Sequence, residues 1–137
     1  WNYRVVNDFD INTKTRLRLE EESQEDSIEV TASLDIDNLS NIKGMMMDIS
    51  YDTTKIVRQG DIDLSIDGWD ISVRSIREGS FSVLFYAKPL SPPIEDDTEL
   101  FDMVFEKIGS GDPNIEINNI ILSDGDEDIF LPDVKLN

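Results

Sequence analysis

The sequence of 137 residues contains neither cysteine nor histidine. Without cysteine there is no disulfide, no thiolate nucleophile and no zinc–thiolate site. Without histidine, the Ser-His and Cys-His nucleophilic pairs are excluded, together with the imidazole ligands of most catalytic zinc and non-haem iron sites. These two absences remove the commonest catalytic machineries, so we expect a protein that is not an enzyme.

Positive charge is scarce, because 12 Lys and Arg stand against 30 Asp and Glu, for a formal net charge of −18. A field of this sign repels phosphate backbones and anionic lipids, which excludes nucleic acid as a partner. It attracts cations and basic protein surfaces, although plain solubility explains an acidic surface equally well. Long apolar runs are also missing, and none approaches the ~18 residues of a membrane span, so membrane insertion is not expected.

The chain starts at Trp1, without an initiator Met and without the apolar core of a signal peptide. We therefore expect a monomeric module of a larger protein. Its length is typical of one domain. Residues 1–15 are expected to form an N-terminal linker or an extra edge strand, and residues 16–137 the folded domain.

Helical periodicity is missing as well, whereas apolar and polar residues alternate in several short runs. Alternation with a period of two is typical of strands buried on one face. It is clearest over residues 28–36 and recurs over 44–51 and 101–105. Residues 69–85 predict a β-hairpin whose turn lies at 77–80.

Turn residues separate these runs. Three prolines make residues 88–97 an exposed loop, and a shift of apolar parity at 118–119 predicts a β-bulge or a bend between sheets. Residues 129–136 predict a closing strand at a sheet edge because they include a proline. Residues 16–19 predict a short strand, followed by the solvated acidic run 20–26. About nine short strands favour an all-β, two-sheet β-sandwich with jelly-roll or Greek-key topology.

The order of these landmarks resembles a cohesin module. Gly44 leads into Ile49-Ser50-Tyr51-Asp52, in which the Tyr-Asp pair is the anchor of the resemblance. Residues 79–85 resemble the central hairpin strand of the family, and 99–105 its acidic-to-apolar seventh strand. Residues 115–126 are similar to its last hairpin. The resemblance covers residues 16 to 136.

Two departures from the family pattern concern its subtype more than its fold. The acidic run 20–26 replaces a Gly-containing turn, and Thr53 stands where a Pro follows Tyr-Asp. The resemblance implies a non-catalytic module that holds a dockerin on one flat sheet face. A dockerin is a small calcium-loaded helical module that attaches enzymes to a cellulosome-type scaffold or a cell surface. The resemblance therefore also implies a secreted or cell-surface protein.

Strand parity then predicts which side chains meet the partner. If Met47 and Ile49 are in the core, Met46 and Asp48 point outward, and the same alternation applies to residues 82–86. The predicted partner-binding residues are Met46, Asp48, Arg74, Ser82, Leu84 and Tyr86. Among them, Met46 and Leu84 are expected to form an exposed apolar patch suited to a helix. The alternative is that both are ordinary scattered residues or lie under a loop.

Two acidic runs are candidates for a structural calcium ion, with a solvated acidic turn as the alternative. The candidate ligands are Asp8, Asp10 and Asn12 in the first run and Asp124, Asp126 and Asp128 in the second. Neither run completes an EF-hand, since the first lacks Gly at its sixth position and has Leu19 at its twelfth. No other cofactor is expected.

Two other functions stay open. A structural spacer module of a surface protein needs no specialised face and predicts that Met46 and Leu84 are covered. A carbohydrate-binding module, which shares a related sandwich fold, needs a row of exposed aromatic rings. The candidates for such a row are Trp1, Tyr3, Trp69 and Tyr86. Trp69, however, is in register with Ile71 and Val73, which predicts a position in the core.

Overall fold

The structure is a computed structural model that describes residues 15–35, 42–91, 94 and 98–136. Every regular element in this part of the chain is a β-strand, which confirms the all-β class. None of the described segments forms a helix able to span a membrane. The strands are β1 (Arg16–Ser23), β2 (Ser27–Asp35), β3 (Gly44–Ser50), β4 (Ile56–Leu64), β5 (Trp69–Arg77), β6 (Ser80–Ala87), β7 (Thr98–Lys107), β8 (Glu116–Ser123), β9 (Asp128–Leu131) and β10 (Val134–Lys135).

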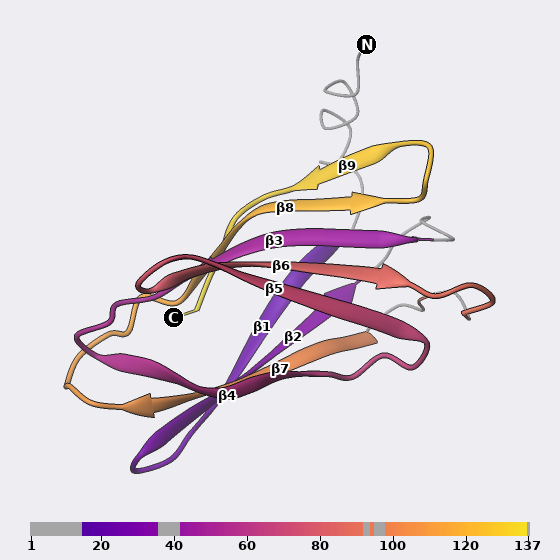
Figure 1. Cartoon of the computed structure of the whole chain (residues 1–137). Coiled ribbons are helices and arrows are strands. Elements are labelled where there is room, and N and C mark those ends of the chain that lie inside the picture. The colour runs from indigo at the N-terminus through magenta and orange to yellow at the C-terminus, as the bar shows by residue number, and fades with distance from the viewer. Residues whose placement is uncertain (1–14, 36–41, 92–93, 95–97, 137) are drawn as a thin grey trace.

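The strands form two antiparallel sheets that pack face to face (Figure 1). The four-stranded sheet has the order β1-β2-β7-β4. The six-stranded sheet has the order β10-β8-β3-β6-β5, with β9 also paired to β8. The chain crosses between the sheets after β2, β3, β4, β6 and β7, as in a jelly roll. The predicted two-sheet sandwich is therefore confirmed.

Apolar side chains from both sheets meet in one core. In β2, Ile28, Val30, Ala32 and Leu34 are all buried, as their alternation predicts. Between the sheets, the ring of Phe85 in β6 stacks on that of Phe101 in β7, with ring centroids 5.0 Å apart. Burying a side chain of this size stabilises the fold by about 1.5–3 kcal/mol. This shared core holds the two outer faces in place.

The Tyr-Asp pair lies in the turn that carries the chain from β3 to β4. Tyr51 packs edge-on against Phe105, with ring centroids 5.1 Å apart. The Asp52 carboxylate accepts hydrogen bonds from the Thr54 amide (2.9 Å) and hydroxyl (2.6 Å). These bonds lower the pKa of Asp52 below its ordinary value. Asp52 thus closes the turn with its own side chain, without a proline at position 53.

The predicted hairpin over residues 69–85 is formed by β5 and β6. Gly79 in its turn has a φ of 80°, and an added Cβ would lie 2.7 Å from Thr53 Cγ2. Trp69 is buried as predicted, whereas Val73 is 39% exposed instead of lying in the core. The reason is that β5 is the end strand of its sheet, so its inward side chains are covered from one side only.

Three segments differ from the expectation. β1 extends to Ser23 instead of ending at Leu19, because pairing with β2 continues through the acidic residues, which stay exposed. β4 was not predicted, since a register break and Gly60, with a φ of 75°, interrupt its alternation. The closing segment is two short strands, β9 and β10, on either side of Pro132. Both strands pair with β8 at the end of the six-stranded sheet, which confirms the predicted edge position of the closing segment.

The predicted loop over 88–97 forms no strand at the positions that the structure describes, and residues 88–90 are exposed as expected. Ile94, however, is buried in the core, so the loop is not exposed throughout. The segment 1–15, predicted to be a linker or an edge strand, lies outside the described residues apart from Thr15.

Candidate partner-binding face

The outer face of the six-stranded sheet carries large apolar side chains. Met45 and Met47 point into the core, so Met46 between them points outward and is 43% exposed. Leu84 on β6 is 45% exposed and lies directly opposite Met46 in the β3–β6 register. The predicted outward placement of this pair on neighbouring strands is confirmed.

The two residues belong to an apolar row that crosses four strands. Met46 lies opposite Ile121 of β8, and Ile121 lies opposite Phe130 of β9. Ile121 is half-buried, and Phe130 is 40% exposed. We call Phe130, Ile121, Met46 and Leu84 the apolar row. Side chains directly opposite on antiparallel strands have Cβ atoms about 5 Å apart, so the row forms one continuous strip.

A second row, of polar residues, runs beside the first and is centred on Asp48 of β3. Asp48 lies opposite Ser82 of β6, which in turn lies opposite Arg74 of β5. The Ser82 hydroxyl donates a short hydrogen bond to Asp48 Oδ1, and Asn119 Nδ2 donates to Asp48 Oδ2 at 2.8 Å. We call Asn119, Asp48, Ser82 and Arg74 the polar row. Both Asp48 oxygens are therefore held by neighbouring strands.

A β-bulge in β8 places Asn119 in this row. Ile117 and Ile120 are both buried although three positions apart, and the β3–β8 register shifts between Met46 and Asp48. Asn119 takes up the extra residue with a φ of 53°, a left-handed conformation that Asn tolerates better than most residues. The bulge predicted at residues 118–119 is confirmed, and it directs the Asn119 amide toward Asp48.

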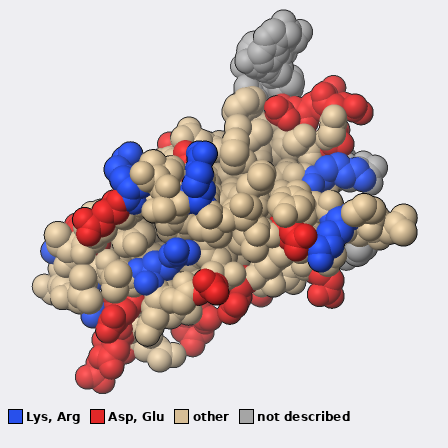
Figure 2. Space-filling model, viewed as in Figure 1, with Lys and Arg blue, Asp and Glu red and all other residues tan. Residues whose placement is uncertain are grey.

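On the other flank of the apolar row lies Tyr86, which is 43% exposed. It lies opposite Gly44 on one side and Asp70 on the other. Lys88 Nζ and Asp70 Oδ1 form an exposed ion pair at 3.5 Å. Figure 2 shows Lys and Arg side chains at the left and right of the visible face, with a band of uncharged side chains between them. That band lies over the middle of β3, β6 and β8 (Figure 1).

The structure brings all the predicted partner-binding residues to this one face. They are Met46, Asp48, Arg74, Ser82, Leu84 and Tyr86. Sequence analysis missed Ile121, Phe130 and Asn119, which β8 and β9 add to it. The parity shift at the bulge was the available signal, because burying Ile120 turns Ile121 outward.

The second calcium candidate is not assembled. Asp124 instead closes the β8–β9 turn, since its Oδ1 accepts the amides of Asp126 and Glu127 at 2.8 Å each. These backbone hydrogen bonds lower the pKa of Asp124. Across the described ranges, no group of three acidic side chains is placed to hold a metal ion, so Asp124, Asp126 and Asp128 do not form the predicted site. The first candidate, Asp8, Asp10 and Asn12, lies outside those ranges.

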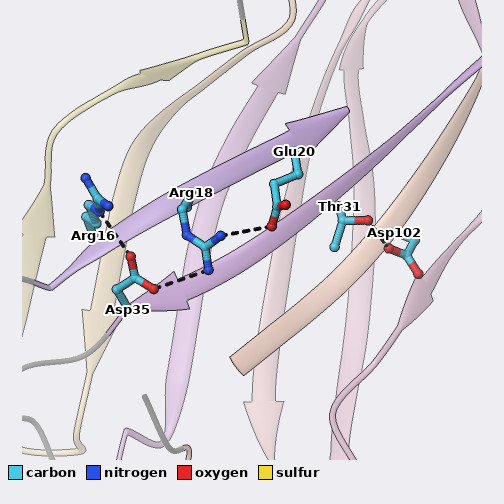
Figure 3. Close-up of polar contacts among 6 residues, drawn as sticks. All are labelled: Arg16, Arg18, Glu20, Thr31, Asp35 and Asp102. Carbon is cyan, nitrogen blue, oxygen red and sulfur yellow. Dashed lines mark hydrogen bonds and ion pairs between the residues drawn. The ribbon is translucent and has the colours of Figure 1, made fainter. Parts of the chain in front are cut away.

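The outer face of the four-stranded sheet is mostly polar, and several of its polar side chains contact one another (Figure 3). Asp35 accepts hydrogen bonds from Arg16 Nε at 3.0 Å and from Arg18 at 3.3 Å. Partial burial raises the pKa of Asp35, but these two guanidinium groups outweigh it and hold the pKa below its ordinary value. Thr31 Oγ1 donates to Asp102 across the next strand pair at 2.7 Å.

The sequence matches no protein-family model and no curated protein. Solved structures do match it. A cohesin module of a family 33 glycoside hydrolase from Clostridium perfringens has a TM-score of 0.77 at 12% identity, covering 91% of this chain and 95% of that one.

Two further structures agree. A type II cohesin from Acetivibrio cellulolyticus, in a complex with an X-dockerin, has a TM-score of 0.62 at 14% identity, covering 92% of this chain and 99% of that one. A non-cellulosomal cohesin from the archaeon Archaeoglobus fulgidus has a TM-score of 0.60 at 14% identity, covering 88% of each chain. The chain therefore has the cohesin fold, as the order of its sequence landmarks predicts.

Proposed function

We propose that this chain is a non-catalytic protein-binding module that holds a dockerin-like helical partner on the outer face of its six-stranded sheet. The observation that carries the proposal is the exposed pair Met46 and Leu84 within the apolar row. Clustered apolar side chains rimmed by polar ones are typical of protein-binding surfaces. The fold supports the same conclusion, since the similar cohesin from Acetivibrio cellulolyticus is in a complex with a dockerin.

The proposal also gives the chain a cellular location and a biological role. A module that holds such a partner serves in scaffold assembly or in attachment to a cell surface, which puts this chain outside the cell. Its surplus of acidic residues favours a partner that is not strongly acidic, because like charges repel on encounter.

The two alternatives are less well supported. A spacer module predicts that Met46 and Leu84 are covered, yet both are more than two-fifths exposed. A carbohydrate binder needs a row of aromatic rings. In the described part of the chain, the exposed rings on this face are Tyr86 and Phe130, and β3 and β8 lie between their strands.

The test is isothermal titration calorimetry of the chain against a panel of calcium-loaded type I and type II dockerin modules. We expect the wild type to bind at least one of them. Met46→Asp places a charge in the centre of the apolar row and is expected to weaken binding about 100-fold or more, as at other interface hot spots. Circular dichroism verifies that each variant is folded.

Val57→Asp is the matched control. Val57 is a strand residue of similar exposure, 41%, but it lies on β4 of the four-stranded sheet. We expect this variant to keep the wild-type affinity. If the wild type binds no dockerin, the proposed function is wrong. If both substitutions weaken binding equally, the partner uses another surface.

A further inference from the structure

The proposed binding face has a direction, which the two rows define. The apolar row runs from β9 through β8 and β3 to β6, perpendicular to the strands. The polar row runs parallel to it through β8, β3, β6 and β5. Resting on the proposed function, we propose that the partner helix lies across the strands along the apolar row, with one polar flank over the polar row.

No single strand offers an equivalent apolar line. The outward positions of β3 are Gly44, Met46, Asp48 and Ser50, of which one is a large apolar residue. On β6, the outward residues Ser82, Leu84 and Tyr86 change from a hydroxyl to an aliphatic side chain to a phenol. A helix lying along β3 would meet one large apolar side chain, and one lying along β6 would meet two, Leu84 and Tyr86. The direction across the strands gives the longest apolar contact line, with four large side chains in the apolar row.

The spacing of the row matches an α-helix. Neighbouring strands lie about 4.8 Å apart, and a helix rises about 5.4 Å per turn. A helix laid across the sheet therefore places about one side chain per turn over each strand. The three strand intervals from Phe130 to Leu84 span about 14 Å, the length of about ten helical residues. The partner recognised by this row presents apolar residues at i, i+3, i+7 and i+10.

The polar row determines which side chains the partner helix must carry on one flank. Ser82 and Asn119 each bond one oxygen of Asp48, so the carboxylate is fixed in orientation and keeps lone pairs that accept further hydrogen bonds. A hydroxyl, amide or ammonium group on the helix matches this acceptor. Exposed Arg74 lies at the β5 end of the row, where an acidic side chain is complementary. The partner is thus an amphipathic helix with a donor in the middle of one flank and an acid near one end.

The test compares substitutions across the strands with a substitution along one strand, using a calcium-loaded dockerin that binds the wild type. Leu84 and Tyr86 form a matched pair, since they lie on the same strand with 45% and 43% exposure. We expect Leu84→Ala and Ile121→Ala each to weaken binding about 10-fold, as truncations within a contact line do. We expect Tyr86→Ala, which lies on the binding face but beside the apolar row, to weaken binding clearly less than either of them, by about 3-fold, as for a rim residue.

A second measurement needs no substitution. In methyl NMR spectra of the wild type, the resonances of Ile121 and Leu84 are expected to shift together as the dockerin is added. This readout covers the case in which Ile121→Ala, at a half-buried position, disturbs the fold itself.

The outcomes separate this inference from the proposed function. Suppose that Met46→Asp abolishes binding and that Tyr86→Ala weakens it as much as Leu84→Ala does. If, in addition, Ile121→Ala keeps the wild-type affinity and the Ile121 resonance does not shift, the helix lies along the strands. That result overturns the inference and leaves the proposed function standing. Unchanged binding in Met46→Asp, or no dockerin binding to the wild type, overturns both.

Discussion

The two outer faces of this sandwich come from the same alternating pattern but differ in how their side chains are used. On the four-stranded sheet, Arg16 and Arg18 each pair with Asp35, and Thr31 donates a hydrogen bond to Asp102 (Figure 3). On the six-stranded sheet, the apolar row faces solvent although such side chains are stabilised by burial. Polar side chains of the first face are therefore paired within the sheet, whereas burial of the apolar row on the second face would be favourable.

This contrast shows that packing in the core constrains the inward residues of both sheets but not the outward ones. Inward residues of both sheets pack into the same interior, as the Phe85–Phe101 contact illustrates. Outward residues need not fit a shared interior, so one face can carry ion pairs of small energetic value and the other an exposed apolar row.

The largest effect should come from removing the support that both faces share. Phe85→Ala leaves a cavity between the sheets and is expected to lower the free energy of unfolding by about 3–5 kcal/mol. Tyr86→Ala, one position further along β6 and exposed, is expected to lower it by less than about 1 kcal/mol. Guanidinium denaturation measures both variants. Equal losses would contradict the alternation on which the two-face comparison rests.

Next in size is the bulge that shapes the polar row. Asn119→Gly removes the hydrogen bond to Asp48 but keeps the left-handed backbone accessible, so it should cost about 0.5–1 kcal/mol. Asn119→Ala adds backbone strain and should cost about 1 kcal/mol more. Urea denaturation compares the two. If Ala is tolerated as well as Gly, the left-handed conformation at this position is wrong.

The polar face should depend on pH. Because the pKa of Asp35 is lowered from 3.8 in the folded protein, its contribution is complete above that value and is lost as the pH falls through the lowered pKa. Asp35→Asn is expected to cost up to about 1 kcal/mol at pH 7, and this difference from wild type should shrink below pH 3.8. Urea denaturation at several pH values checks this. A difference that is constant down to pH 2 contradicts it.

The smallest effect on stability is expected on the apolar face itself. The double variant Met46→Thr, Leu84→Thr replaces exposed apolar groups with a residue that favours strands, so the free energy of unfolding should change by less than about 0.5 kcal/mol. Thermal denaturation followed by circular dichroism measures it. A loss of 2 kcal/mol or more would mean that these side chains support the fold and are not kept for a partner.

Sequence analysis predicted part of the candidate face and missed the rest for physical reasons. Parity alone was enough for Met46 and Leu84, because both lie in uninterrupted alternating runs with clear core neighbours. Sequence analysis missed Ile121, although the parity shift at residues 118–119 signals its outward direction, and it missed Phe130, because only the pairing of β9 with β8 brings that residue into the row. The strand β4 was not predicted, because a register break interrupts its alternation of apolar and polar residues.

The sequence by itself determined the all-β class, most strand positions and the outward direction of Met46 and Leu84, because alternation with a period of two is a local property of the chain. Only the tertiary structure decided which strands are neighbours. The apolar row exists because β9, β8, β3 and β6 pair in one register, and the polar row because Asn119 reaches Asp48 from 71 residues away. Such contacts depend on which strands pair and in what register, and no local pattern encodes that.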